Sequence, residues 1–138
     1  MIEFDSQNGW LIGVTQRPSP NYDERPSETD IDLVVIHGIS LPPGHFGGPW
    51  IDHLFTNSLS PEAHPYFSEI ARLRVSAHVL IRRHGEIIQY VSFYQRAWHA
   101  GNSEFQGRRA CNDFSIGIEL EGADDIPYTK RQYEQLAR

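Results

Sequence analysis

The sequence predicts a single α/β domain, and three segments carry that prediction. Residues 33–36 form an apolar run with β-branched side chains in the middle, which is typical of a strand. A hairpin pattern follows at residues 79–91, and strict alternation of apolar and polar residues at 115–121 indicates another strand. Short helical patterns lie between and after these strands. A length of 138 residues suits one domain, so we expect residues 1–138 to share one core.

The first elements are predicted from residues 15–49. Residues 15–32 are polar and proline-rich, so we expect an extended surface loop. The continuous apolar run at 33–37 then predicts a strand that is covered on both faces, as in the centre of a sheet. His37 stands at its carboxyl end, where open α/β sheets place their ligands. Residues 38–49 hold four glycines and three prolines, which predicts an irregular loop.

The middle of the chain predicts two short packing helices and a hairpin. The helices are expected from Pro49 through residue 55 and from Pro65 through residue 73, because proline suits the first turn of a helix. In the hairpin, His84 and Gly85 fit a two-residue turn between β-rich runs. That turn places Arg83 opposite Glu86, and Ile81 opposite Ile88.

The last two elements are a strand and the beginning of a helix. In the strand, Gly117, Glu119 and Glu121 share the face opposite to the isoleucines at 116 and 118. Thr129 and Gln132 then fit a capping box that begins a helix. No Gly, Asn or Pro ends this helix before the last residue, so we expect the domain to be incomplete at its C-terminal end.

Composition narrows the classes of function. Acidic residues outnumber basic ones by 18 to 12, and the formal net charge is −6, so a basic surface for nucleic acid is missing. No apolar run approaches the ~18 residues of a membrane span. The N-terminus shows no secretory signal, and Cys111 is the single cysteine. We therefore expect a cytoplasmic monomer that binds neither nucleic acid nor membrane.

His37 and Glu119 are the strongest candidates for chemistry. The chain has seven histidines, and His37 is the best placed of them. Glu119 is a carboxylate in the middle of an apolar strand, and each of the two residues has a glycine close by in sequence. Together they resemble half of a hydrolytic zinc site, with a ligand and a proton-transfer carboxylate. An ion pair between Glu119 and an arginine explains the carboxylate equally well.

Weaker candidates are Trp98, His99 and Arg74. An aromatic residue followed by a histidine in a turn suits a surface on which a sugar stacks, although core packing is the more common role. Arg74 is a lone cation that suits a carboxylate partner, either on a ligand or within the protein. The HExxH and CxxC motifs are missing, as are the GxGxxG and GxxxxGK nucleotide fingerprints.

Several motifs together resemble one family. They are GWLIG at 9–13, RPSPNY at 17–22, VVIH at 34–37, SLPPG at 40–44, FGGPWID at 46–52, RVSAH at 74–78, RAWHAG at 96–101 and CNDFSIGIELEG at 111–122. In this order they resemble the bacterial zinc-dependent type 2 N-acetylmuramoyl-L-alanine amidases, which are related in fold to peptidoglycan recognition proteins.

The resemblance implies a mixed β-sheet with packed helices. It also implies a cytosolic, zinc-dependent hydrolase of cell-wall recycling, which cleaves the amide between anhydro-N-acetylmuramic acid and L-alanine of the stem peptide. By position, His37 matches the first zinc ligand and Glu119 the catalytic carboxylate. Arg74 matches an arginine that holds a carboxylate of the anhydro-muropeptide substrate, while Ala97 and Trp98 match residues that line the cleft.

Two residues depart from the family pattern, and a larger difference lies at the C-terminus. Gly38, a candidate substrate contact, stands where the family often has Asn, and Ala110 where it often has Arg. The resemblance implies that the other two zinc ligands, a His and an Asp, and a lysine lie beyond Arg138. We therefore expect the 138-residue chain by itself to be inactive. The alternatives are a peptidoglycan-fragment binder without a complete zinc site, and a folding fragment without a ligand.

Overall fold

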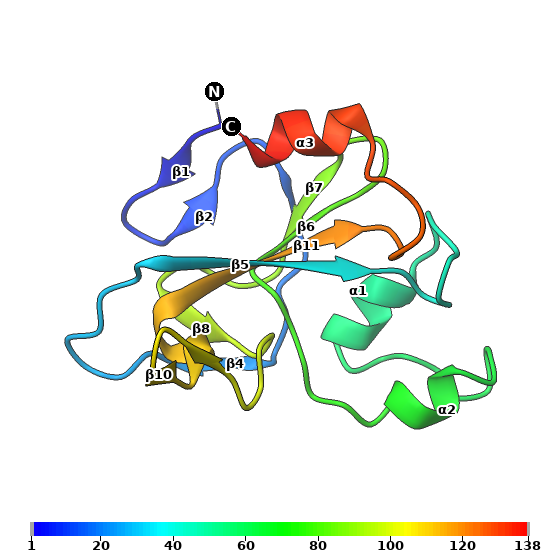
Figure 1. The fold of residues 1–138 in the computed structure, drawn as a ribbon, viewed down its shortest axis with the longest axis horizontal. Helices are drawn as coiled ribbons and strands as arrows, with labels where there is room; N and C mark the ends of the chain where they lie inside the picture. Colours follow the sequence, from blue (N-terminus) through cyan, green and yellow to red (C-terminus); the bar gives the residue numbers. More distant parts are fainter. Residues whose placement is uncertain (1, 138) are drawn as a thin grey trace.

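The computed structural model describes residues 2–137 and is built around a five-stranded sheet (Figure 1). The strand order is β3-β7-β6-β11-β5. In that order the strands are Thr15–Gln16, Ile87–Gln89, Val79–Ile81, Ser115–Glu121 and Leu33–Ile39. Strand β11 runs parallel to both of its neighbours, whereas β6 and β7 are antiparallel. The mixed sheet that the resemblance implies is confirmed.

Three short helices and several small strand pairs surround this sheet. The helices are α1 (Trp50–Phe55), α2 (Phe67–Ile70) and α3 (Lys130–Leu136), with a 3-10 helix η1 at Cys111–Phe114. The strand pairs are β1 (Phe4–Asp5) with β2 (Trp10–Leu11), β4 (Tyr22–Glu24) with β8 (Gln95–Ala97), and β9 (Glu104–Phe105) with β10 (Arg108–Arg109). None of the helices in the described chain is long and apolar enough to cross a membrane.

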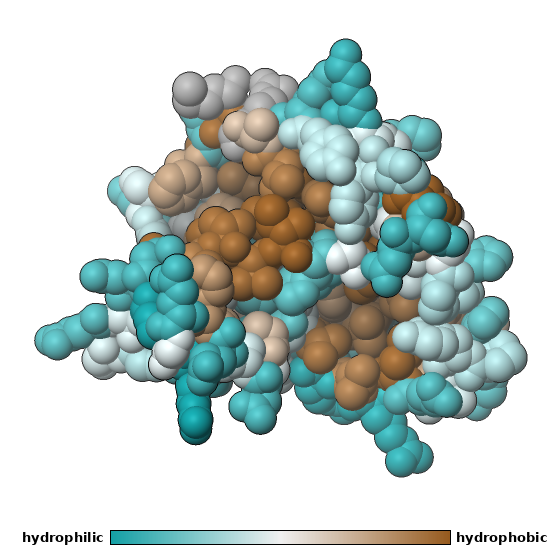
Figure 2. Space-filling model, in the orientation of Figure 1, coloured by the Kyte–Doolittle hydropathy of each residue, from teal (hydrophilic) through white to brown (hydrophobic). Residues whose placement is uncertain are grey.

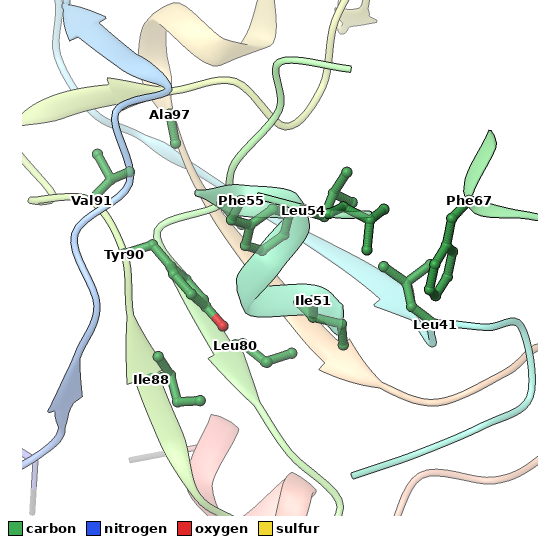
Figure 3. Close-up of a cluster of buried hydrophobic side chains, with 12 residues drawn as sticks. Leu41, Ile51, Leu54, Phe55, Phe67, Leu80, Ile88, Tyr90, Val91 and Ala97 are labelled. Atoms are coloured by element: carbon green, nitrogen blue, oxygen red, sulfur yellow. The ribbon is translucent and has the colours of Figure 1, made fainter. Parts of the chain in front are cut away.

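Apolar side chains cover both faces of the sheet because residues along a strand alternate between the faces. On one face, Leu80 and Ile88 belong to a core cluster that also contains Leu54 and Phe55 of α1 (Figure 3). On the other face, Val79, Ile81, Ile87 and Leu120 form a second cluster, against which Leu136 of α3 packs. The sheet is therefore the middle layer between α1 and α3.

Strand β5 differs from its prediction, because it is an edge strand and not a central one. It pairs with β11 alone, so only one of its sides is hydrogen-bonded within the sheet. Its burial alternates, and Val34 and Ile36 are 54% and 50% exposed. Figure 2 shows apolar surface on the face that contains this strand. A continuous apolar run does not distinguish an edge strand from a central one.

The hairpin between β6 and β7 forms, but its register was predicted wrongly. Ile81 pairs with Ile87, and the backbone N–H of Arg82 donates to the carbonyl of Glu86 at 2.9 Å. The loop therefore has three residues instead of two, with Gly85 at a φ of +90°. Glycine at the last position of a three-residue loop closes the hairpin without steric strain.

Two other predictions need correction, and one is confirmed. Residues 15–32 are not one loop, because they contain β3 and β4, which pair with β7 and β8. The helix expected at 65–73 is shorter and spans Phe67–Ile70. The capping box of α3 is confirmed, since the Thr129 side chain accepts from the N–H of Gln132 and the Gln132 side chain accepts from the N–H of Thr129.

Candidate active site

The parallel pairing of β5 with β11 brings His37 and Glu119 side by side. Glu119 is in register with His37 on one side and with Leu80 of β6 on the other. Residues in register on neighbouring parallel strands project from the same face of a sheet. Both side chains therefore project from the face that carries α1.

Glu119 is buried without a compensating partner. Its residue is 7% exposed, and its neighbour Leu80 is fully buried. Within residues 2–137, its carboxylate makes no hydrogen bond or salt bridge, so desolvation raises its pKa to about 8. The ion pair with an arginine that we considered for Glu119 is not found among these residues.

Glu121, two residues further along the same face, has the opposite environment. Its carboxylate accepts from the N–H of Gly47 at 2.8 Å and lies 3.5 Å from the guanidinium of Arg82. It also accepts from the N–H of Arg83 at 3.3 Å. Glu121 therefore connects β11 to two loops and has a structural role.

A chain of hydrogen bonds holds the imidazole of His37. Its Nε2 lies 3.0 Å from Nδ1 of His99, and Nε2 of His99 lies 3.0 Å from Oγ of Ser115. The ring of His99 lies directly against Gly117, where a Cβ would overlap it. Burial lowers the pKa of both histidines, that of His99 to about 3, so both rings are neutral near pH 7.

The surroundings of His99 are themselves fixed by hydrogen bonds. The side-chain oxygen of Asn112 accepts from the N–H groups of His99 and Ala100, at 3.2 and 2.9 Å. Below the ring, Nδ1 of His78 accepts from the N–H of Gly117 at 3.0 Å. Nε2 of His78 therefore carries the proton and donates to the carbonyl of Gln95 at 2.9 Å. Burial lowers the pKa of His78 to about 4.

Sequence reasoning did not assign roles to His78, Ser115 or Asn112, and it considered His99 only as part of a sugar-stacking turn. These residues act through contacts between segments far apart in the chain, such as the one between His37 and His99. Two features of the sequence pointed toward these contacts. They are the number of histidines and the glycine at 117, which permits the ring of His99 to approach the backbone of β11.

A cavity of about 440 Å³ opens beside His37 and His99. One wall is β5 and the other contains Ser103 and Phe105. Because β5 is an edge strand, its outer backbone groups border this cavity. An extended ligand lying here would reach the imidazole of His37.

The other candidate residues range from exposed to fully buried. Arg74 is exposed and makes no salt bridge within the described chain. The indole of Trp98 is half-buried and donates to Asp23 at 3.2 Å. Ala97 is 0% exposed and belongs to the core cluster below α1. A Cβ on Gly38 would collide with the hydroxyl of Tyr128, so glycine avoids an overlap that any larger residue would cause here.

Comparisons with known proteins show which family this chain resembles. Residues 27–138 match the family model described as N-acetylmuramoyl-L-alanine amidase. The 1,6-anhydro-N-acetylmuramyl-L-alanine amidase AmpD of Escherichia coli K12 is 65% identical over 131 residues, which are 95% of this chain and 72% of the relative.

Two solved structures are similar as well. A crystal structure of a selenomethionine derivative of AmpD has a TM-score of 0.94 and 63% identity, over 98% of this chain and 74% of that one. The solution structure of Citrobacter freundii AmpD has a TM-score of 0.65 and 63% identity, over 98% of this chain and 71% of that one.

Proposed function

The chain belongs to the N-acetylmuramoyl-L-alanine amidase family, and from this premise we propose that it hydrolyses anhydro-muropeptides. The bond cleaved is the amide between the lactyl group of 1,6-anhydro-N-acetylmuramic acid and L-alanine of the stem peptide. The 65% identity to an enzyme named for this substrate supports the proposal. The reaction belongs to the recycling of cell-wall fragments.

The observation that carries the proposal is the buried carboxyl of Glu119 beside His37. A carboxyl group whose pKa is about 8 gains and loses protons near neutral pH. We propose that ionised Glu119 takes a proton from the attacking water and then passes it to the leaving nitrogen. The products are a lactyl carboxylate on the sugar and the free amino group of L-alanine.

The family resemblance also implies a zinc ion, and we propose His37 as one of its ligands. Catalytic zinc takes three protein ligands. Within residues 2–137, however, no group of three or more His, Cys, Asp or Glu side chains is arranged to hold a metal ion. The described residues do not fit a zinc ion by themselves, and the proton transfers proposed above involve Glu119 alone.

Other residues are proposed to contact the substrate. Exposed Arg74 has no partner for its guanidinium in residues 2–137, which supports a role in holding a carboxylate of the stem peptide. We propose that Trp98 and the backbone at Gly38 border the substrate cleft. Ala97, which the resemblance places there too, is 0% exposed and packs in the core, so it does not contact a ligand directly. We also propose that the protein acts in the cytoplasm, since its single cysteine, Cys111, is free.

A second candidate function is binding of peptidoglycan fragments without hydrolysis. The incomplete metal-ligand set of residues 2–137 favours it. The test incubates the chain with an anhydro-muropeptide and Zn²⁺, follows release of the stem peptide by mass spectrometry, and measures binding by calorimetry. The Escherichia coli relative serves as the active control.

The three outcomes of this test differ. Release of the stem peptide by this chain supports the amidase. Saturable binding without release supports the second candidate. Neither binding nor release, while the control cleaves the same substrate, contradicts the proposal.

A further inference from the structure

A second cavity lies apart from the candidate active site. Its volume is about 350 Å³, and it shares no lining residue with the cavity beside His37. Its walls come from three segments: the connection between β1 and β2, residues 18–22, and residues 90–95. The first two belong to the GWLIG and RPSPNY motifs or adjoin them, and the proposed amidase chemistry uses neither.

The walls of this cavity are held in place by backbone contacts. The carbonyl of Gly9 accepts from the N–H of Phe93 and from the Gln89 side chain, each at 3.0 Å. Gly9 has a φ of +77°, and a Cβ there would overlap Oγ of Ser92. Ser92 Oγ donates to the carbonyl of Asn8 and accepts from the N–H of Tyr94 at 3.2 Å. The connection between β1 and β2 is thus fixed against residues 92–94.

The lining is aromatic and amide-rich, and none of the described residues that form it is charged. Trp10, Tyr22 and Tyr94 provide ring surface, and the two tyrosines are 47% and 45% exposed. Gln95 and Asn8 provide side-chain amides. The whole chain has 18 acidic and 12 basic residues, and none of those within residues 2–137 lines this cavity.

Several polar groups of the lining are free to bind a ligand. Within residues 2–137, the indole N–H of Trp10, the phenol of Tyr22 and the side-chain amide of Gln95 make no hydrogen bond. The side-chain oxygen of Asn8 accepts from the N–H of Trp10 at 3.0 Å, which leaves its NH₂ group available. Aromatic faces and unused amide groups therefore surround one space.

The strand pairing separates this cavity from Trp98. Tyr22 is in register with Ala97, and Glu24 with Gln95, so Tyr22 and Gln95 project from one face of the β4–β8 pair. Asp23, which accepts from the indole of Trp98 at 3.2 Å, projects from the opposite face. A ligand in the cavity therefore contacts Tyr22 without contacting Trp98.

We propose that this cavity binds a neutral sugar ring. Aromatic faces cover the apolar C–H face of a pyranose, while amides and hydroxyls form hydrogen bonds with its hydroxyl groups. A volume of about 350 Å³ is near the lower limit of ligand sites, which are about 300 to 1,000 Å³, and suits one ring. A phosphate or carboxylate would lose its hydration here without meeting a positive charge.

The proposal goes beyond the amidase function and is independent of it. The candidate active site acts on an amide, whereas this cavity would bind the glycan portion of a cell-wall fragment or a separate sugar. It requires neither Glu119 nor a metal ion. Loss of the amidase function would therefore leave the sugar site intact, and the reverse also holds.

The test uses the whole chain labelled with ¹⁵N at its three tryptophans, Trp10, Trp50 and Trp98. Each indole N–H signal is assigned by a Trp→Phe variant, and N-acetylglucosamine and its β-1,4-linked trimer are titrated in. We expect a saturable shift of the Trp10 signal, with Trp50 and Trp98 unchanged. Because no charged residue lines the site, the affinity should be constant between about pH 5 and about pH 8.

Two variants and a control test the lining itself. Tyr22→Ala and Gln95→Ala should each weaken binding at least about threefold, since each loses a direct contact. Tyr66→Ala removes an exposed tyrosine outside the cavity and should leave binding unchanged. Circular dichroism of each variant verifies the fold.

Three results would overturn the proposal. The first is a Trp10 signal that does not shift when each sugar is added up to its solubility limit. The second is a shift of Trp98 instead, which would place the sugar at the candidate active site. The third is a shift of Trp10 by the tripeptide Ala-Glu-Lys but not by either sugar, which would make the cavity a peptide site.

Discussion

Glu119 and Glu121 have the same side chain on the same face of β11, yet their surroundings differ completely. Glu121 receives two backbone N–H groups and lies 3.5 Å from Arg82, so its charge is compensated. Glu119 lies between His37 and Leu80 with no such partner in residues 2–137. A structural carboxylate has its charge compensated, whereas one that transfers protons must be able to change charge.

The first prediction concerns this difference. Glu119→Gln should lower amidase turnover about 100-fold or more, because general acid–base catalysis is worth about 100 to 10,000-fold. The substitution is made at the aligned position of the Escherichia coli relative, and stem-peptide release is measured. Glu86→Gln, at an exposed position, is the matched control. Turnover of the Glu119 variant within about tenfold of the unmodified protein would refute the assignment.

The raised pKa of Glu119 also predicts how stability depends on pH. The folded protein keeps this proton up to about pH 8, whereas the unfolded chain releases it near 4.5. Between these values the folded state binds more protons, so the free energy of unfolding should fall as the pH rises. The contribution is complete below about pH 4.5 and is lost by about pH 8, on the order of 5 kcal/mol.

Urea unfolding of the unmodified protein and of Glu119→Gln at several pH values measures this effect. Buried histidines with lowered pKa values, such as His99, give the opposite slope at acidic pH, but they are common to both proteins. The difference between the two proteins therefore isolates Glu119. A difference that does not change between about pH 5 and about pH 8 would mean that the carboxyl has an ordinary pKa.

Gly117 is the residue on which the position of His99 depends. Gly117→Ala should displace the imidazole of His99 from His37 and destabilise the protein by about 1 to 3 kcal/mol, as overpacking does. The free energy of unfolding and the NMR signals of both histidines measure the change. Adding His99→Ala to this variant should recover part of the stability, because it removes the overlapping ring. Full additivity of the two substitutions would show that they do not interact.

At the scale of elements, the sequence predicts best where local chemistry decides the structure. The strand at Ser115–Glu121 and the capping box at Thr129 follow from alternation and from side-chain hydrogen bonds between near neighbours. The position of β5 at the edge of the sheet depends on pairings with residues about 80 positions away. The hairpin register depends on one residue of loop length, which Gly85 permits but does not require.

The capping box of α3 allows a quantitative test at this scale. Thr129 Oγ1 accepts from the N–H of Gln132 at 3.1 Å and donates to the carbonyl of Arg83 at 2.7 Å. Thr129→Ala should lower the free energy of unfolding by about 1 to 2 kcal/mol, since it removes a cap and a tertiary hydrogen bond. Thr129→Ser keeps both groups and should cost much less. Equal losses in the two variants would show that the methyl group, and not the hydroxyl, stabilises the helix.

At the scale of the molecule, the sheet assembles the candidate site from distant parts of the chain. The predicted pair of His37 and Glu119 is brought together by β5 and β11, as their strand-like patterns suggested. The additional contact of His37 with His99 was not predictable, because His99 follows β8 and reaches the site only through tertiary folding. Local patterns thus predicted which strands form the site, while the loops that complete it required the structure.

The last prediction concerns how tightly the described residues can hold a zinc ion. His37 has an imidazole, His99, as its hydrogen-bond partner at 3.0 Å, and residues 2–137 provide no group of three donors. A zinc ion held by one or two imidazoles exchanges rapidly, because a stable catalytic site takes three protein ligands in fixed geometry. After incubation with Zn²⁺ and dialysis, the chain should therefore retain far less than one equivalent of zinc, measured by atomic emission.

His37→Ala should reduce weak zinc binding in a direct titration, whereas His84→Ala, in the exposed hairpin loop, should not. One tightly held equivalent that survives dialysis and is lost in His37→Ala would show that these residues rearrange around the metal into a complete ligand set.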